Sequence, residues 1–377
     1  MRNIIKSILL ALLVLLSPNF IHASKQAKMA KKSGEIRIKD VSPHKTLNLN
    51  YNYGEMELVF WDKKEIVLKY DECVRASSQK RADEILQKRI AIESIEGRYF
   101  KVGKADDSSV SFNSKWTVYV PSHISSVAAS NSFGNITVGK GFPGLIRIDV
   151  QNGDVNIPET KAMCVVEVTH GNFYVGNAAY LNMTTKHANG TISFAQTLKV
   201  QAEHADFCKI DKADVMTINS KHSKIKVGNV GQLSSQGSYS TLEVNELSGL
   251  ANIRDMQHST IEMDKFLGKL DATDLSYSKL NITISKFNHT PFIMVTDLDY
   301  TDVKVKLPAS LRTSTYVNGK GSCRSISSGT AKIKSSAPWS SPNGVSTHVF
   351  QNTESFTPNS LIDINNESYG TILIEEY

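Results

Sequence analysis

The sequence predicts an all-β protein, a parallel β-solenoid in which short strands wind into stacked coils. Three observations predict it: one motif recurs at a near-constant step, each copy alternates apolar and polar residues, and the repeating part has no useful stretch of helical periodicity. Alternation with a period of two is typical of a strand that buries one face. A coil of about 18 residues cannot bury that face alone, so it must stack on the next coil.

The recurring motif is a ring or amide residue, a small or polar residue, and two apolar residues one position apart. It reads "GSYSTLEV" at 237–244, "LSYSKLNI" at 275–282 and "LDYTDVKV" at 298–305. Coils are mostly 17 to 19 residues long, with one step of 23. Like positions of successive coils lie above one another, so we expect the ring or amide residues, called marker residues below, to form a ladder along one corner. They are Phe133, Asn152, His170, His187, His204, His222, Tyr239, His258, Tyr277 and Tyr300.

The chain divides into five parts. Residues 1–23 have a basic start, a short apolar run and a small residue at the end, the pattern of a cleaved secretory signal peptide. Residues 24–33 contain four lysines and no acid, and we expect a disordered basic leader there. Residues 34–125 are predicted to form an N-terminal strand-helix-strand cap with the first coils. Residues 126–310 carry the solenoid repeats, and residues 311–377 form the C-terminal coils and cap.

The one helix is predicted in "SSQKRADEILQKRI" at 77–90, which begins with serine and places Ala82, Ile85 and Ile90 near one face. A helix over the first coil would cover the open sheet edge, which repeat proteins must protect to stay soluble. At the other end, "SYGTILIEEY" at 368–377 repeats the motif once more, and it echoes "NYGEMELVF" near the start. Both end regions are therefore expected to contain coils.

The sequence resembles the bacterial β-solenoid adhesin domains, including the auto-transporter adhesin head domains. The resemblance rests on the entry through "DKKEIVLKY" and "RADEILQKRI", on "WTVYVPSHISSVAASNSFGNITV", and on the recurring motif. It covers 34–377 and implies a right-handed parallel β-helix of the single-stranded type without catalytic residues. No cysteine follows the signal peptide closely and no second apolar run approaches about 18 residues, so we expect a periplasmic location, with the cell surface or secretion as alternatives.

Charge argues against nucleic acid as a partner. The formal charge is +6, but residues 1–33 hold six of the 43 basic residues and no acid, which leaves 37 basic against 37 acidic residues. We expect a non-catalytic adhesin, envelope scaffold or binding protein without a cofactor, whose partner is an envelope glycan or another surface protein. The alternative is a parallel β-helix enzyme that binds or cleaves polysaccharide, which would need convergent acids beside a base or an arginine. Arg254 adjoins Asp255, but no basic residue recurs near the aspartates of the neighbouring coils.

The candidate ligand-binding residues are Asp255, Asp274 and Asp297. Each lies three residues before the marker residue in three successive coils, so the carboxylates should stack about 4.8 Å apart. Like charges this close repel, so the column would recruit a cation, bind sugar hydroxyl groups or be separated by water. The competing interpretation is that aspartate suits a solvated turn.

Histidines and cysteines predict no metal site and no disulfide framework. Five marker residues are histidines, but rings stacked about 4.8 Å apart do not converge within about 2.1 Å of one ion, and Tyr and Phe share the same positions. Cys164 and Cys208 lie in predicted strands more than two coils apart, so we expect buried free thiols. Cys73 and Cys323 would pair only if the two end regions meet.

Overall fold

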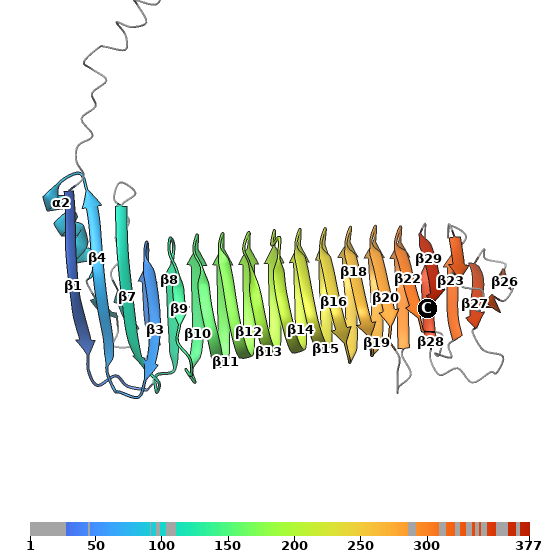
Figure 1. Ribbon diagram of the computed structural model, residues 1–377, viewed down its shortest axis with the longest axis horizontal. Helices are drawn as coiled ribbons and strands as arrows, with labels where there is room; N and C mark the ends of the chain where they lie inside the picture. The colour runs from blue at the N-terminus through green and yellow to red at the C-terminus, as the bar shows by residue number, and fades with distance from the viewer. Residues whose placement is uncertain are drawn as a thin grey trace, which may run out of the picture.

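A computed structural model describes residues 28–43, 46–90, 92–95, 99–102, 111–285, 292–308, 314–320, 325–328, 334–335, 339–340, 345–351, 361–366 and 370–377. Over these residues the chain is a parallel β-solenoid, nearly all β with a single short helix, and it forms an elongated rod (Figure 1). The predicted signal peptide and Cys323 lie outside the described residues. No helix in the described part is long and apolar enough to span a membrane.

Each regular coil contributes strand to two faces of the rod, and the faces meet at the marker residues. The first face follows each marker residue, and the second face precedes the next one. Long strands run along both faces in the middle coils: β11 (Val155–Thr169), β12 (Asn172–Lys186), β13 (Asn189–Glu203), β14 (Cys208–Lys221) and β15 (Lys224–Ser238). Elsewhere the faces have separate strands. The first has β9 (Ile136–Val138), β16 (Thr241–Leu247), β18 (Thr260–Phe266), β20 (Lys279–Ile284) and β22 (Asp302–Leu307); the second has β8 (Ser126–Asn131), β10 (Leu145–Gln151), β17 (Leu250–Gln257), β19 (Lys269–Ser276) and β21 (Phe292–Asp299).

A single apolar core runs through the rod, from Val41 at one end to Ile374 at the other. Strand β16 shows how the sequence builds it, because Leu242 and Val244 are buried while the residues between them face outward. Leu242 lies between Ile225 of the preceding coil and Ile261 of the next. Burying one such side chain contributes about 1.5–3 kcal/mol, and stacking repeats that contribution in every coil. The predicted alternation, coil length and fold are confirmed.

At the N-terminal end, spatial order departs from chain order. Strands β2 (Thr46–Tyr51) and β3 (Glu55–Trp61) form a coil that lies directly beside β8 and β9. The cap is inserted after this coil in the chain but continues the sheets outward: β6 (Tyr99–Val102) pairs with β2, and β7 (Ser111–Pro121) pairs with β3. The antiparallel strands β4 (Ile66–Ala76) and β1 (Lys28–Ile38) complete the first face, and β5 (Ile92–Ile95) pairs with β6.

Part of the predicted basic leader is ordered strand, so the prediction of a disordered segment over 24–33 is wrong from Lys28 onward. Residues 28–33 pair with β4 as the start of β1. Ala30 is buried in this strand, whereas Lys28, Lys31 and Lys32 are exposed. Lysines on an outermost strand hinder pairing with another chain, which gives this basic run a structural role.

The predicted helix is α2 (Gln79–Arg89), and Ser78 caps it by accepting a hydrogen bond from the Arg81 amide at 3.3 Å. Serine at this position satisfies one of the free amides at a helix start. The helix buries Ala82, Ile85 and Leu86 in a small cluster with β1 and β4. It therefore packs on the outer antiparallel strands, at the end of the rod in Figure 1, and not over the first coil as expected.

The C-terminal end repeats this arrangement. Strands β28 (Leu361–Asn366) and β29 (Thr371–Glu376) stack directly on β21 and β22. Strands that precede them in the chain, β23 (Ser314–Lys320) and β24 (Ser325–Ser328), lie outside them. Beyond β23, β27 (Val345–Gln351) pairs antiparallel with β23, β25 (Lys334–Ser335) and β26 (Trp339–Ser340). The last copy of the motif thus forms a coil strand, with Ile372 and Ile374 buried.

Candidate functional site

The marker residues form the predicted ladder. Eight rings stack without a break, with neighbouring ring centroids 4.7–5.0 Å apart and ring planes at most 15° from parallel. Tyr53 and Phe133 form a separate stacked pair at 4.8 Å, and Asn152 occupies the coil between the pair and the long stack. The members of the long stack are His170, His187, His204, His222, Tyr239, His258, Tyr277 and Tyr300.

The ladder forms where the backbone turns through the left-handed region. Every ring of the long stack, and Asn152, has a φ between 48° and 55°. Residues other than glycine rarely adopt this region, although Asn and His are enriched among those that do. The residue after the marker is small for a related reason. A Cβ on Gly171 would lie 1.9 Å from the Gly153 carbonyl oxygen, so these two coils approach too closely there for a side chain, whereas the later coils hold Ala, Ser or Thr at this position.

A second, buried ladder runs beside the rings, formed by Ser223, Ser240, Ser259, Ser278 and Thr301. Each hydroxyl donates to the carbonyl two residues earlier, as Ser259 does to Gln257 at 2.8 Å. Each also accepts from a backbone amide of the preceding coil, as Ser259 does from Ser240 at 3.2 Å. Sequence analysis registered only a small or polar residue after the marker. The run of hydroxyl residues was the available signal.

The outer surface of the ring ladder is a row of polar ring edges. Stacking covers the ring faces, but Tyr239 and Tyr277 remain 54% and 53% exposed. Phenol and imidazole groups at these edges donate and accept hydrogen bonds at a spacing set by the coils. Among the described residues, no three His, Cys, Asp or Glu side chains converge as a bound metal ion requires. The ladder therefore offers repeated hydrogen bonding and aromatic contact.

The three candidate aspartates do lie in one column on the second face. The residues on either side of Asp255 pair with those on either side of Asp274, and the same register carries Asp274 to Asp297. All three have left-handed backbones, with φ of 50°, 56° and 54°. The column begins at a β-bulge, where β17 has one more residue than β15. Asp tolerates this conformation, so the bulge supplies a structural reason for the residue type.

Contacts along the aspartate column are unequal. Asp297 accepts hydrogen bonds from Thr273 at 2.9 Å and Thr296 at 3.3 Å. Asp255 and Asp274 make no hydrogen bond or ion pair with any described residue. Arg254 is directed elsewhere, with its guanidinium nitrogen 3.5 Å from a carboxylate oxygen of Asp271. An enzyme site would need an arginine beside the aspartate column, and Arg254 does not take that position.

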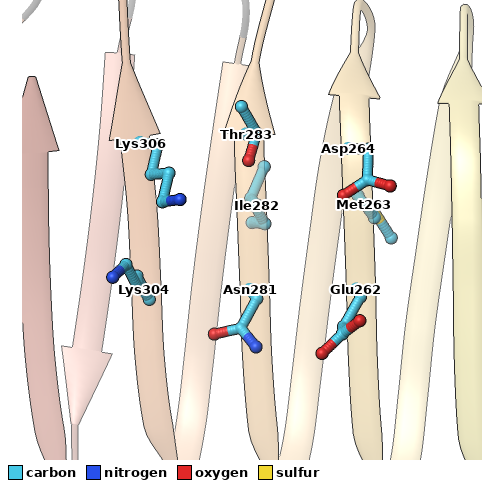
Figure 2. A pocket seen from close by; sticks show the side chains of 8 residues that line it. All are labelled: Glu262, Met263, Asp264, Asn281, Ile282, Thr283, Lys304 and Lys306. Atoms are coloured by element: carbon cyan, nitrogen blue, oxygen red, sulfur yellow. The ribbon is translucent and has the colours of Figure 1, made fainter. Parts of the chain in front are cut away.

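A polar recess lies on the first face across β18, β20 and β22, with a volume of about 290 Å³ (Figure 2). Two acids, Glu262 and Asp264, line it from β18, and two lysines, Lys304 and Lys306, line it from β22. Asn281 and Thr283 of β20 lie between them. Sequence analysis missed this site because its residues come from three coils separated by unequal steps, so their alignment depends on the register of pairing.

A buried ion pair lies within the cap, and its arginine also hydrogen-bonds to the first coil. Arg89 at the end of α2 lies 3.0 Å from Glu72 of β4, and both side chains are at most 1% exposed. Ser114 donates to Glu72 at 2.5 Å, and Trp116 donates to the same carboxylate. Arg89 also donates to the Asn52 carbonyl at 2.8 Å. Burial lowers the pKa of Arg89, which the charge of Glu72 partly offsets. This cluster is closed to ligands and serves to fix the cap.

The cysteines behave as predicted for buried thiols. Cys164 and Cys208 are free and fully buried, and burial raises the pKa of each thiol to about 12. A thiol that stays protonated is a poor nucleophile and metal ligand. Cys73 is free and half-buried in β4. Cys73 is therefore not bonded to Cys323, which itself lies outside the described residues.

No protein-family model and no curated protein matches this chain. Solved structures do match it; of three reported below, two are named as adhesion proteins and one as a lipid binding protein. A "putative adhesin" from Parabacteroides merdae is 15% identical, with 74% of this chain and 96% of that chain covered and a TM-score of 0.34. A "putative cell adhesion protein" from Clostridium sporogenes is 10% identical, with 93% and 100% covered and a TM-score of 0.20. A "putative lipid binding protein" from Parabacteroides distasonis is 8% identical, with 73% and 96% covered and a TM-score of 0.31. Identities and TM-scores this low transfer no ligand or function to this chain.

Proposed function

We propose that this protein is an exported, non-catalytic β-solenoid that binds an extended envelope glycan or a surface protein along its ring ladder. The observation that carries the proposal is the unbroken stack from His170 to Tyr300, in which eight exposed ring edges repeat at 4.7–5.0 Å along a rigid core. Repetition converts one weak contact into many simultaneous ones, so an extended ligand gains affinity that a short one lacks.

Export is part of the proposal and rests on the signal-peptide pattern of residues 1–23. Within this proposal the periplasm is favoured over the cell surface or secretion. Fractionation of the producing cells, with immunodetection in periplasm, outer membrane and medium, tests the location. Recovery in the cytoplasm with residues 1–23 intact would contradict export.

A glycan panel tests the binding proposal when binding and product release are measured on the same samples. Binding without release of fragments supports the non-catalytic function. Release of shortened or unsaturated oligosaccharides would instead establish the alternative, a polysaccharide-cleaving β-helix enzyme. Binding should grow steeply with oligosaccharide length, because a longer ligand contacts more coils.

A ring-deletion variant locates the binding surface. The double substitution Tyr239→Asn and Tyr277→Asn removes two rings but keeps residues that tolerate the left-handed backbone, as Asn152 already does in this chain. The matched control is Tyr174→Asn, which removes a ring that is 44% exposed and outside the ladder. The proposal expects weaker polymer binding in the double variant alone. Equal binding by all three proteins would place the contact elsewhere.

A further inference from the structure

We infer that the recess on β18, β20 and β22 is a binding site for a small amino-acid zwitterion. Glu262 and Asp264 would hold the ammonium group, and Lys306 would hold the carboxylate. The inference is independent of the ring ladder and of the polymer-binding proposal, because the recess and the ladder share no residue.

The charges that line the recess lack internal partners. Glu262, Asp264 and Lys306 make no hydrogen bond or ion pair with any described residue. Lys304 differs, because its ammonium lies 2.9 Å from Glu375 on the neighbouring strand β29. Figure 2 shows the same division: the nitrogen of Lys306 lies on the side of Thr283, and the nitrogen of Lys304 points away from the recess. Two carboxylates and one ammonium therefore remain to interact with a ligand.

Strand spacing sets the size of that ligand. Strand β20 lies between β18 and β22, so the backbones that carry the acids and Lys306 stand two strand spacings apart, about 9.6 Å. The Lys306 side chain reaches toward β20 (Figure 2), so a charge-assisted hydrogen bond of about 2.8 Å at each end leaves at most about 4 Å between the ammonium and carboxylate groups of the ligand. An α- or β-amino acid has this separation. Asn281 and Thr283 lie beneath the middle of the gap and can hydrogen-bond the remaining polar atoms.

The arrangement also selects against ligands of a single charge. A simple carboxylate would meet Lys306 but also the two acids, and a simple amine would meet the acids but also Lys306. Each gains one attraction and suffers one repulsion, whereas the zwitterion gains at both ends. The contacts are open to solvent, so each is weak and the dissociation constant is expected to be tens of millimolar or higher.

Ligand-detected saturation-transfer NMR on the intact chain tests the inference with three matched probes. L-alanine carries both charges, propionate keeps only the carboxylate, and ethylamine keeps only the ammonium. L-alanine is expected to bind about fivefold more tightly than either analogue, because each analogue loses one ionic contact. Equal affinities for the three probes, or no saturation transfer to L-alanine, would overturn the inference.

Charge exchange provides the decisive variant. Asp264→Asn and Lys306→Met should each weaken L-alanine binding about threefold to fivefold, whereas Lys269→Met on the second face should leave it unchanged. The double variant Asp264→Lys with Lys306→Asp restores two opposite charges in reversed order, so the small ligand can bind turned around. Recovery of binding in this double variant supports the inference. Failure of the double variant to recover, in a protein with unchanged circular dichroism, would contradict it.

Discussion

At the scale of single residues, left-handed backbone positions explain two features that sequence analysis kept apart. The marker residues from Asn152 to Tyr300 and the three candidate aspartates all have φ near 50°. The left-handed conformation destabilises an ordinary residue by about 1–2 kcal/mol, so contacts with neighbouring residues must offset this cost at each position. Ring stacking recovers it in the marker ladder, where each ring contacts the rings above and below. The aspartates form no such stack. Their residue type is explained by the bulge, whose left-handed backbone aspartate tolerates.

The buried hydroxyl ladder should be intolerant of deletion. Ser259→Ala leaves the Ser240 amide without its acceptor in a buried region, and it removes one of two hydrogen bonds to the Gln257 carbonyl, which keeps the Tyr239 amide as a donor. We expect the free energy of unfolding to fall by about 1–3 kcal/mol, measured by chemical denaturation. Ser259→Thr is the control, because Thr301 makes the same contacts in this chain. Equal losses in the two variants would show that volume, not hydrogen bonding, matters there.

Glu243 should give stability that depends on pH. Its carboxylate lies 2.7 Å from Lys224 and 2.7 Å from Lys226, and the hydrogen bond to Lys224, followed by that to Lys226, lowers its pKa. Because the pKa of Glu243 is lower in the folded state, its ionised carboxylate stabilises the fold at pH values above the unfolded-state pKa of about 4.3. This stabilisation is lost as the pH falls through the folded-state pKa. Glu243→Gln should therefore cost up to about 1 kcal/mol at pH 7 and nothing near pH 2. A cost that does not change with pH would rule out the ion pairs as its source.

At the scale of elements, the cap depends on the Glu72–Arg89 pair. Removing one partner leaves a buried charge uncompensated, so Arg89→Met should lower the free energy of unfolding by about 3–5 kcal/mol. Replacing both, with Glu72→Met and Arg89→Met, should cost clearly less than the two single losses together, because no charge is left buried. A double-mutant cycle by chemical denaturation measures this coupling. Additive losses would mean that the two side chains act separately.

The aspartate bulge can be separated from any ligand role by choice of substitution. Changing Asp255, Asp274 and Asp297 together to asparagine removes the charge but keeps a residue that tolerates the left-handed backbone. We expect this triple variant to unfold like the wild type. The same triple change to alanine should destabilise by about 1–2 kcal/mol per position, since alanine loses the local compatibility.

Ligand assays on the same two triple variants decide whether the column does more. A loss of calcium-dependent or glycan-dependent association in the asparagine variant would assign the column to ligand binding. Unchanged association there, with the alanine variant destabilised, would reduce the column to backbone geometry. The bulge already accounts for aspartate at these positions, so we expect the second outcome.

At the scale of the molecule, sequence predicted what repeats and missed what does not. The constant step places Tyr239 over His222 and Asp274 over Asp255, so the ladder and the column were predictable from spacing alone. The recess was not, because pairing Asn281 with Lys304 requires counting across a longer coil. Arg89 reads as an ordinary basic residue at a helix end, and nothing in the sequence marks it as buried.

The spatial order of strands in the two end regions escaped prediction for a topological reason. Periodicity gives the order of coils only where chain neighbours are also spatial neighbours, and both ends break that rule. Strands β2 and β3 lie inside the cap that follows them, and β28 and β29 lie inside the strands that precede them. The strand over 28–33 was hidden in the same way, since its partner β4 lies about forty residues further along the chain.

The stacking of coils predicts that damage to the core spreads only locally. The main contacts of each strand are with the coils on either side, as in other solenoids. Ile210 and Ile374 are both fully buried. Ile210→Asp places an unpaired charge in the middle of the core, and Ile374→Asp places one in β29 near the end. Burying such a charge costs several kcal/mol, enough to open the coil that holds it.

Hydrogen exchange measured by mass spectrometry should separate the two variants by position. Ile210→Asp should lose amide protection in β13, β14 and β15 while β20 and β22 keep theirs, because the coils between them hold their own stacking contacts. Ile374→Asp should lose protection in β22 and β29 and leave β13 to β15 unchanged. Uniform loss along the rod in the Ile374→Asp protein would mean that the single core unfolds as one cooperative unit, and the nearest-neighbour account would then fail.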